Sequence, residues 1–354
     1  MRQRFYLSLL VVLVVAVFSS CERDDDEPLQ SRSISRLYVS YSNFQPDESQ
    51  TQIDNISVIS NADSSNFGIL NSFYRSAAKG GSTIYFHPSS QTVFHASINS
   101  TVTDTLIQTL RVGETGQVSS SNTKIPNGRL TGVRGLVFHP GMDKLYAVSV
   151  NSKGSFINIF DRPRGISSYT KTSQRYILAN NLPAWDAAIV QSNLVLSRTG
   201  TNGGLDIFED IIPKRDSVFN NVSSTRSLTV EGANNIRGMS IDTVNNMLAL
   251  TDYSIINNDT VGRILIFDNF SEISKVSGNI TPSRIISGAN TLLKQPVDVD
   301  LDFRLNSKYL YVVDPATRYI HRFLKTDNGN IKPESSLPSA NNRRPISISL
   351  DARQ

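Results

Sequence analysis

A unit of about 50 residues recurs along this chain of 354 residues. Each copy has an apolar strand, a short polar turn, a second strand rich in Leu, Tyr and Val, and two further apolar segments. The first strands end at intervals of 52, 52, 51, 60 and 49 residues: His87, His139, Gln191, Asp242, Asp302 and Asp351. Four short strands in a unit of this length are typical of a β-propeller blade. A β-sandwich would not repeat one four-strand unit so regularly.

The third copy shows the pattern most clearly. Its first strand is predicted at 133–139, and a turn around Gly141 leads to a second strand at 145–150. A third strand follows at 156–161 and a fourth near 175–178. The other copies follow the same order, with the fourth copy the weakest.

The two ends of the chain determine the number of blades. The last segment, 345–351, reads as a first strand with nothing after it, and 36–41 reads as a second strand with nothing before it. Together they predict one composite blade, in which 346–350 pairs with 37–41 and closes the ring without a free seam. We therefore predict an all-β fold, a six-bladed propeller over residues 34–354 with an N-/C-terminal strand clasp.

These repeats resemble the six-bladed NHL and gluconolactonase-type propellers. The segment 133–161 also resembles the blade signature of the lactonase-like propellers, which usually have seven blades. The resemblance covers about 320 residues but is generic, and propellers host many unrelated activities. It therefore implies the fold far more than the function.

The first 21 residues carry an export pattern. Basic residues at 1–4 precede an apolar stretch at 5–18, the small pair Ser19-Ser20 and the only cysteine, Cys21. The apolar stretch is shorter than the ~20 residues of a membrane-spanning helix. The pattern resembles a lipoprotein signal peptide with a lipobox at 18–21, which implies removal of residues 1–20 and lipidation of Cys21. The alternative is an ordinary secretory signal that ends at a cysteine.

Residues 22–33 are polar and begin with an acidic run. They show no apolar periodicity, so we expect residues 21–33 to be a disordered, lipidated tether. The acidic run resembles the surface-export signal of lipoproteins in the Bacteroidetes, and its alternative is a solvated spacer. We therefore expect a lipid-anchored protein of the outer membrane, exposed at the cell surface.

Charge and cysteine content exclude some functions. Removal of residues 1–20 takes away two arginines, so the formal charge falls from +4 to +2. Nucleic-acid binding therefore has no support. With Cys21 lipidated, no thiol remains for a disulfide, a thiolate metal site or a nucleophile.

Polar side chains gather where first strands begin and second strands end. In an antiparallel blade these points lie on one face of the ring. First strands begin near Arg134, Asp186, Arg237 and Asp298, and second strands are followed by Asn43, Asn99, Asn151, Arg198, Asp252 and Asp314. The opposite face receives short turns of ordinary composition. We therefore expect a ligand site on the first face, at the mouth of the central channel.

Arg134 and Arg237 occupy equivalent places, each followed by Gly, with Asp186 at the same place in the blade between them. Two guanidiniums at one mouth could hold a carboxylate or a phosphate. The alternative is that the three residues pair with one another and brace the blades. Trp185 beside Asp186 could stack on a sugar ring, or it could pack in the core.

The resemblance to gluconolactonase-type propellers implies one divalent cation, such as calcium, held in the channel by Glu, Asn and Asp. Asn43, Asn151, Asp252 and Asp314 are oxygen ligands of the right type. No inner glutamate matches the metal-binding Glu of that family, and any set of blade loops supplies some Asn and Asp. The residues themselves indicate no cofactor.

The chain contains no Gly-x-Ser-x-Gly elbow, His-Glu-x-x-His, Cys-x-x-Cys or Walker loop. His87 and His139 each precede proline at equivalent strand ends and are expected to be structural, and His95 and His321 to pack within strands. We therefore predict a non-catalytic binding module for a glycan, a peptide or an envelope protein. The alternative is a metal-dependent hydrolase of the lactonase or esterase type that uses Asp252 or Asp314.

Overall fold

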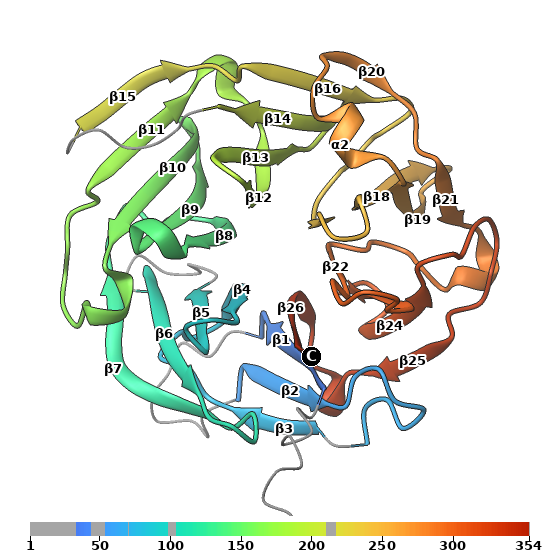
Figure 1. The fold of residues 1–354 in the computed structure, drawn as a ribbon, viewed down its shortest axis with the longest axis horizontal. Coiled ribbons are helices and arrows are strands. Elements are labelled where there is room, and N and C mark those ends of the chain that lie inside the picture. Colours follow the sequence, from blue (N-terminus) through green and yellow to red (C-terminus); the bar gives the residue numbers. More distant parts are fainter. Residues whose placement is uncertain (1–32, 44–53, 70, 98–103, 210–216, 354) are drawn as a thin grey trace, which may run out of the picture. The chain divides into compact units, whose positions relative to one another are not determined.

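A computed structural model describes residues 33–43, 54–69, 71–97, 104–209 and 217–353. The signal segment, Cys21, most of the tether and Asn99 lie outside the described residues. Residues 34–353 form six sheets arranged as a ring, with the innermost strand of each sheet at the centre (Figure 1). The all-β, six-bladed propeller predicted from the repeat is confirmed.

Each blade has four antiparallel strands that follow one another from the centre outward. Blade 1 contains β26 (Pro345–Arg353), β1 (Ile34–Tyr41), β2 (Ile56–Ser60) and β3 (Asn71–Tyr74). Blade 2 contains β4 (Gly81–His87), β5 (Thr92–Ser97), β6 (Leu106–Val112) and β7 (Val118–Pro126). Blade 3 contains β8 (Val133–His139), β9 (Lys144–Asn151), β10 (Gly154–Asp161) and β11 (Gln174–Leu178).

The second half of the ring repeats this order. Blade 4 contains β12 (Ala184–Val190), β13 (Asn193–Arg198), β14 (Gly204–Phe208) and β16 (Arg226–Val230). Blade 5 contains β17 (Met239–Asp242), β18 (Met247–Ile256), β19 (Asp259–Phe267) and β21 (Arg284–Ser287). Blade 6 contains β22 (Asp298–Leu301), β23 (Tyr309–Asp314), β24 (Tyr319–Leu324) and β25 (Ser335–Pro338).

Among the described residues, helical structure occurs only in the connections between strands. It comprises α2 (Phe270–Ile273) and the 3-10 turns η1 (Pro140–Met142), η2 (Pro163–Gly165), η3 (Ala179–Asn181), η4 (Ala289–Thr291) and η5 (Ala340–Asn342). None of these helices is long and apolar enough to cross a bilayer.

Blade 1 contains the predicted clasp. Strand β26 pairs with β1 in antiparallel register, with Leu37 opposite Leu350 and Val39 opposite Ile348. Buried side chains of both strands then pack against Tyr311 of blade 6. The clasp therefore joins the two ends of the chain to each other and to the neighbouring blade.

Two connections add strands to the outside of the preceding blade. Strand β15 (Ser217–Val222) pairs in parallel with β11, and β20 (Gly278–Ile280) pairs in parallel with β16. A single bridge between Ile286 and Gly329 forms a similar contact between blades 5 and 6. The one long interval of 60 residues in the repeat contains α2 and β20, between β19 and β21, and the long strands β18 and β19 of ten and nine residues.

Candidate ligand site at the channel mouth

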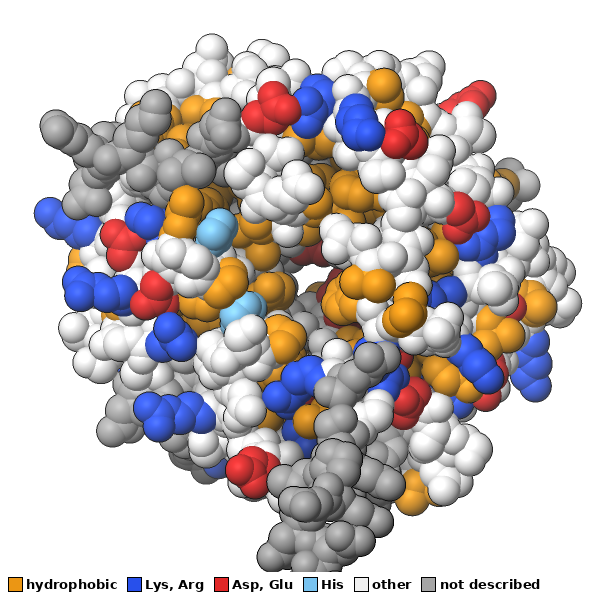
Figure 2. All heavy atoms as spheres, in the orientation of Figure 1, with side chains coloured by type: hydrophobic (Ala, Val, Ile, Leu, Met, Phe, Trp, Pro, Cys, Tyr) orange, Lys and Arg blue, Asp and Glu red, His pale blue; other side chains and the backbone are white. Residues whose placement is uncertain are grey.

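The ring leaves a central channel with two connected cavities. The cavity at the mouth has a volume of about 180 Å³ and is lined by Ser82, Thr83, Gly132, Val133, Arg134, Trp185, Asp186, Gly238, Val297, Asp298, Ile346 and Ser347. A second cavity of about 250 Å³ continues below it. Both cavities are lined by Thr83, Asp186 and Asp298, so these residues lie where the two cavities adjoin. Figure 2 shows that the centre of the ring is open, with acidic side chains visible inside it.

Trp185 lies between two arginines. The guanidinium carbon of Arg134 is 4.2 Å from the centre of the indole ring, and that of Arg237 is 3.7 Å from it. These arginines come from the blades on either side of blade 4. Both contacts are within cation–π range. A sugar ring that stacked on the indole would therefore compete with these two guanidiniums.

The two arginines differ in their other contacts. Arg237 donates to Thr199 Oγ1 at 3.1 Å and to the Tyr253 hydroxyl at 3.0 Å, and it does not line the mouth cavity. Arg134 lines the cavity and has neither a hydrogen-bond acceptor nor an ion-pair partner among the described residues. Burial, reinforced by the charge of Arg237, lowers the pKa of Arg134 to about 10. Arg134 is thus a charged group without an anionic partner among the described residues.

The predicted alternative of mutual pairing does not occur. Asp186 forms no ion pair with Arg134 or Arg237; its carboxylate instead accepts the backbone N–H of Met239 at 2.9 Å and that of Ala187 at 2.8 Å. The bond to Met239 connects blade 4 to blade 5. Burial and the nearby charge of Asp298 raise the pKa of Asp186 well above its ordinary value.

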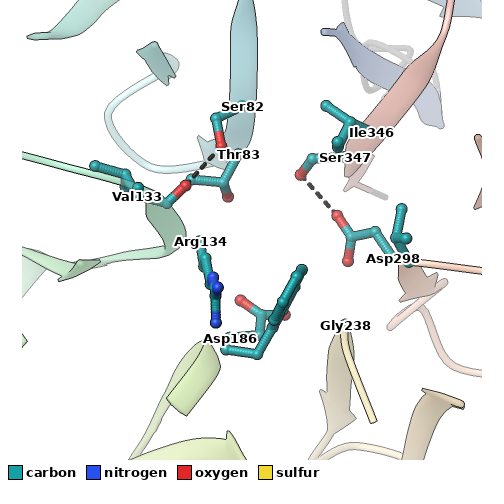
Figure 3. Close-up of a pocket in the computed structure, with 12 residues that line it drawn as sticks. Ser82, Thr83, Val133, Arg134, Asp186, Gly238, Asp298, Ile346 and Ser347 are labelled. Atoms are coloured by element: carbon teal, nitrogen blue, oxygen red, sulfur yellow. Dashed lines mark hydrogen bonds between the residues drawn. The ribbon is translucent and has the colours of Figure 1, made fainter. Parts of the chain in front are cut away.

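Asp298 bridges the ring in the same way. Its carboxylate accepts the Ser347 hydroxyl at 2.7 Å (Figure 3). It also accepts the Ile348 N–H at 2.9 Å, and both donors lie on β26. It also accepts the N–H of Val299 at 2.9 Å. Burial raises the pKa of Asp298 to about 6, and no ion pair with a described residue offsets its charge. Figure 3 shows Arg134 and Asp298 on opposite sides of the opening.

Asp300 is a channel residue that the strand-end pattern did not indicate. Its carboxylate accepts the Leu350 N–H at 2.7 Å and the Ser240 hydroxyl at 2.9 Å. Burial raises its pKa to about 7, with a smaller contribution from Asp298. The alternation of Asp298, Val299 and Asp300 on β22 was the available signal, because side chains two apart point to the same side of a strand.

The glycines after the two arginines are required by close packing of the inner strands. A Cβ atom on Gly135 would lie 2.9 Å from the Asp186 Cα, and one on Gly238 would lie 2.5 Å from the Asp298 Cα. A real side chain there would push neighbouring backbones apart. The glycine after each arginine thus lets the next inner strand approach closely.

Two further predicted ligand residues do not line the mouth cavity. Arg198 pairs with Asp206 at 3.3 Å and donates to the Leu228 carbonyl at 3.0 Å. Asn151 is exposed at the end of β9, where its side chain accepts the Lys153 N–H at 2.8 Å. Of the predicted mouth residues, the structure therefore brings together Arg134, Trp185, Asp186 and Asp298 in one cavity.

The two carboxylates among the predicted metal ligands, Asp252 and Asp314, are occupied by protein donors. The Asp252 carboxylate accepts the Asn234 and Asn235 backbone N–H groups and pairs with Arg263 at 2.5 Å. The Asp314 carboxylate accepts four backbone N–H groups, those of Lys294, Gln295, Ala316 and Thr317. Both carboxylates hold loops in place. Among the described residues, no three His, Cys, Asp or Glu side chains are grouped to hold a metal ion.

The buried histidines are bonded to serines. His95 contacts Ser40 Oγ at 2.8 Å and Ser76 Oγ at 2.7 Å, and burial lowers its pKa to about 3. His321 contacts Ser336 Oγ at 2.9 Å, and burial lowers its pKa to about 4. Both are therefore neutral packing groups at physiological pH, as their strand positions predicted.

No protein-family model and no curated protein match this chain. Solved structures do. The periplasmic gluconolactonase PpgL of Pseudomonas aeruginosa is similar over 90% of this chain and 99% of its own, with 9% identity and a TM-score of 0.55. A putative 6-phosphogluconolactonase from Bacteroides fragilis covers 92% of this chain and 100% of its own, with 10% identity and a TM-score of 0.49. At such identities the likeness concerns the fold alone: the chain is a six-bladed propeller structurally similar to gluconolactonase-type propellers.

Proposed function

We propose that this protein is a non-catalytic binding module of the cell envelope, which takes a small anionic ligand at the channel mouth. The observation that carries the proposal is Arg134, a half-buried guanidinium with no anion beside it among the described residues, in the wall of a 180 Å³ cavity. A buried charge without a partner is costly in free energy. A carboxylate or phosphate that enters the cavity would offset that cost through charge-assisted hydrogen bonds.

The hydrolase alternative has less support. It depends on Asp252 and Asp314 as metal ligands, but backbone N–H groups occupy the oxygens of both, and Arg263 also pairs with Asp252. A cation at either carboxylate would have to displace donors that hold the loops. The binding role at the mouth requires no such rearrangement.

The pair Arg134→Gln and Arg237→Gln tests the binding site. We expect calorimetric titration to show that the unaltered protein binds acetate, propionate or phosphate, and that Arg134→Gln weakens this binding at least tenfold. Arg237→Gln is the matched control, because Arg237 contacts the same indole but is outside the cavity. Equal loss in both variants, or no loss with Arg134→Gln, would contradict a ligand on Arg134.

We also propose that a lipid on Cys21 anchors the protein to the outer membrane, with the propeller at the cell surface. The support is the basic, apolar and small-residue order that ends at Cys21, followed by the acidic tether.

Replacement Cys21→Ser tests the anchor. We expect the native protein to fractionate with membranes and to begin at a diacylated Cys21 in mass spectrometry. The Cys21→Ser protein should lose the lipid and leave the membrane fraction. Protease applied to intact cells should digest the anchored form if it faces outward. An unmodified Cys21, or a mature chain that begins elsewhere, would refute the anchor.

A further inference from the structure

We propose that the mouth cavity takes a zwitterion the size of a single amino acid, with its carboxylate on Arg134 and its ammonium group toward Asp186 and Asp298. This inference rests on the proposed function and specifies the class of ligand. It follows from the charges of the cavity wall, from the hydrogen-bonding groups still available there, and from the cavity volume.

The charges of the wall come first. The mouth cavity is lined by one cation and two carboxyl groups, and none of the three forms an ion pair with a described residue. Hydroxyl and backbone N–H groups are the only donors to Asp186 and Asp298 among the described residues. Burial consequently raises the pKa of both carboxyls. A ligand with one positive and one negative end would compensate both sides of the cavity.

The available hydrogen-bonding groups argue against a sugar. The hydroxyl of Ser82 donates to the Val133 carbonyl, and that of Ser347 donates to Asp298 and accepts the Ile84 N–H. Two arginines already contact the Trp185 indole. A polyhydroxylated ring would therefore compete with them for the indole and find few free partners, and unmatched polar groups are costly when buried.

The size of the cavity agrees with a small ligand. Its volume of about 180 Å³ is below the roughly 300–1,000 Å³ of pockets for drug-sized molecules. Val133, Val297 and Ile346 supply apolar surface between the charged groups. A compact molecule with charged ends and an apolar middle fits this arrangement.

The test uses ligand analogues on the unaltered protein. Each of the twenty common amino acids is titrated calorimetrically at millimolar concentration, and the best binder is compared with its N-acetyl derivative and its amide. The N-acetyl derivative lacks the ammonium charge, and the amide lacks the carboxylate. We expect each derivative to bind at least tenfold more weakly than the parent amino acid.

Other outcomes distinguish the zwitterion proposal from the proposed anion site at Arg134. If the N-acetyl derivative or propionate binds as tightly as the amino acid, and Arg134→Gln abolishes that binding, the zwitterion is refuted and the anion site remains. If no amino acid and no simple anion binds, both are refuted.

Variants of the protein provide a second measurement. Asp186→Asn and Asp298→Asn should each weaken amino-acid binding about tenfold, and they should not weaken binding of the N-acetyl derivative, which has no ammonium charge. Asp298 also accepts bonds from β26, so thermal unfolding of each variant is recorded beside the titration. A folded variant that retains full amino-acid affinity would overturn the proposal.

Discussion

Deletion of residues 344–354 is expected to abolish cooperative unfolding of the propeller. The deletion removes β26, which pairs with β1 and buries Ile348 and Leu350 at 4% and 3% exposure. It also removes the β26 donors of Asp298 and Asp300, which accept the N–H groups of Ile348 and Leu350. Two buried side chains at about 2 kcal/mol each and several orphaned polar groups at about 1–3 kcal/mol each together approach the 5–15 kcal/mol that stabilises a typical domain.

Differential scanning calorimetry checks this expectation. The control is a chain that begins at Ser33, which keeps every described strand of blade 1 and should unfold in a single sharp transition. Excess synthetic peptide of residues 344–354 should restore part of that transition to the truncated protein by strand addition beside β1. An unaltered midpoint after the deletion would mean that β26 does not close the ring.

A second large effect is expected in the pH dependence of the free energy of unfolding, which should differ from the wild type in the variants Asp300→Asn and His321→Gln. Burial raises the pKa of Asp300 to about 7 and that of Asp298 to about 6, against 3.8 for an ordinary Asp. As the pH falls from 8 to 4, these carboxyls take up protons in the folded protein before they do so in the unfolded chain. Acidification over this range therefore increases their contribution to the stability of the fold. Asp186 acts in the same direction.

The buried histidines oppose this trend. The pKa of His95 is lowered to about 3 and that of His321 to about 4, against an ordinary value of 6.5. Below pH 6.5 the unfolded histidines bind protons that the folded ones cannot, so acidification destabilises the fold. The two groups of residues therefore act in opposite directions on the free energy of unfolding between pH 8 and pH 5, and each partly offsets the other.

Single substitutions should separate the opposing contributions of the carboxyls and the histidines to the free energy of unfolding. Between pH 8 and pH 5, Asp300→Asn should lose about 2–3 kcal/mol relative to the wild type, and His321→Gln should gain about 2 kcal/mol, since a one-unit difference in pKa corresponds to about 1.4 kcal/mol. Urea unfolding at pH 5, 6.5 and 8 measures both differences. Parallel profiles for all three proteins would contradict the assignment of these charges.

The sequence was sufficient to predict the ring. Blade strands are local, with a turn of a few residues between them, so their period and order are visible in one chain. The clasp followed from a first strand at 345–351 without successors and a second strand at 36–41 without a predecessor. The structure confirms that pairing.

The site was only partly predictable. The strand-end rule brought Arg134, Asp186 and Asp298 to one mouth, because it depends only on strand direction. It could not show that Trp185 stands between the two arginines, since that contact depends on rotamers in three adjacent blades. The roles of Asp252 and Asp314 as loop acceptors were likewise hidden, because loop conformation decides which N–H groups reach a carboxylate.

The strands added outside blades 3 and 4 affect the tendency of neighbouring copies of the protein to aggregate. An outermost strand with unpaired backbone groups is a template on which another chain can add and start aggregation. On β11 and β16 that template is taken by β15 and β20, so the outer edge moves to these added strands of six and three residues. Among the described residues, β3, β7, β21 and β25 end their sheets without an added strand, although Ile286 of β21 forms one bridge to Gly329. β3, β21 and β25 have four residues each, and the longer β7 ends in Pro126 after Lys124. Proline and lysine both discourage such addition, so neighbouring copies would find few edges on which to assemble.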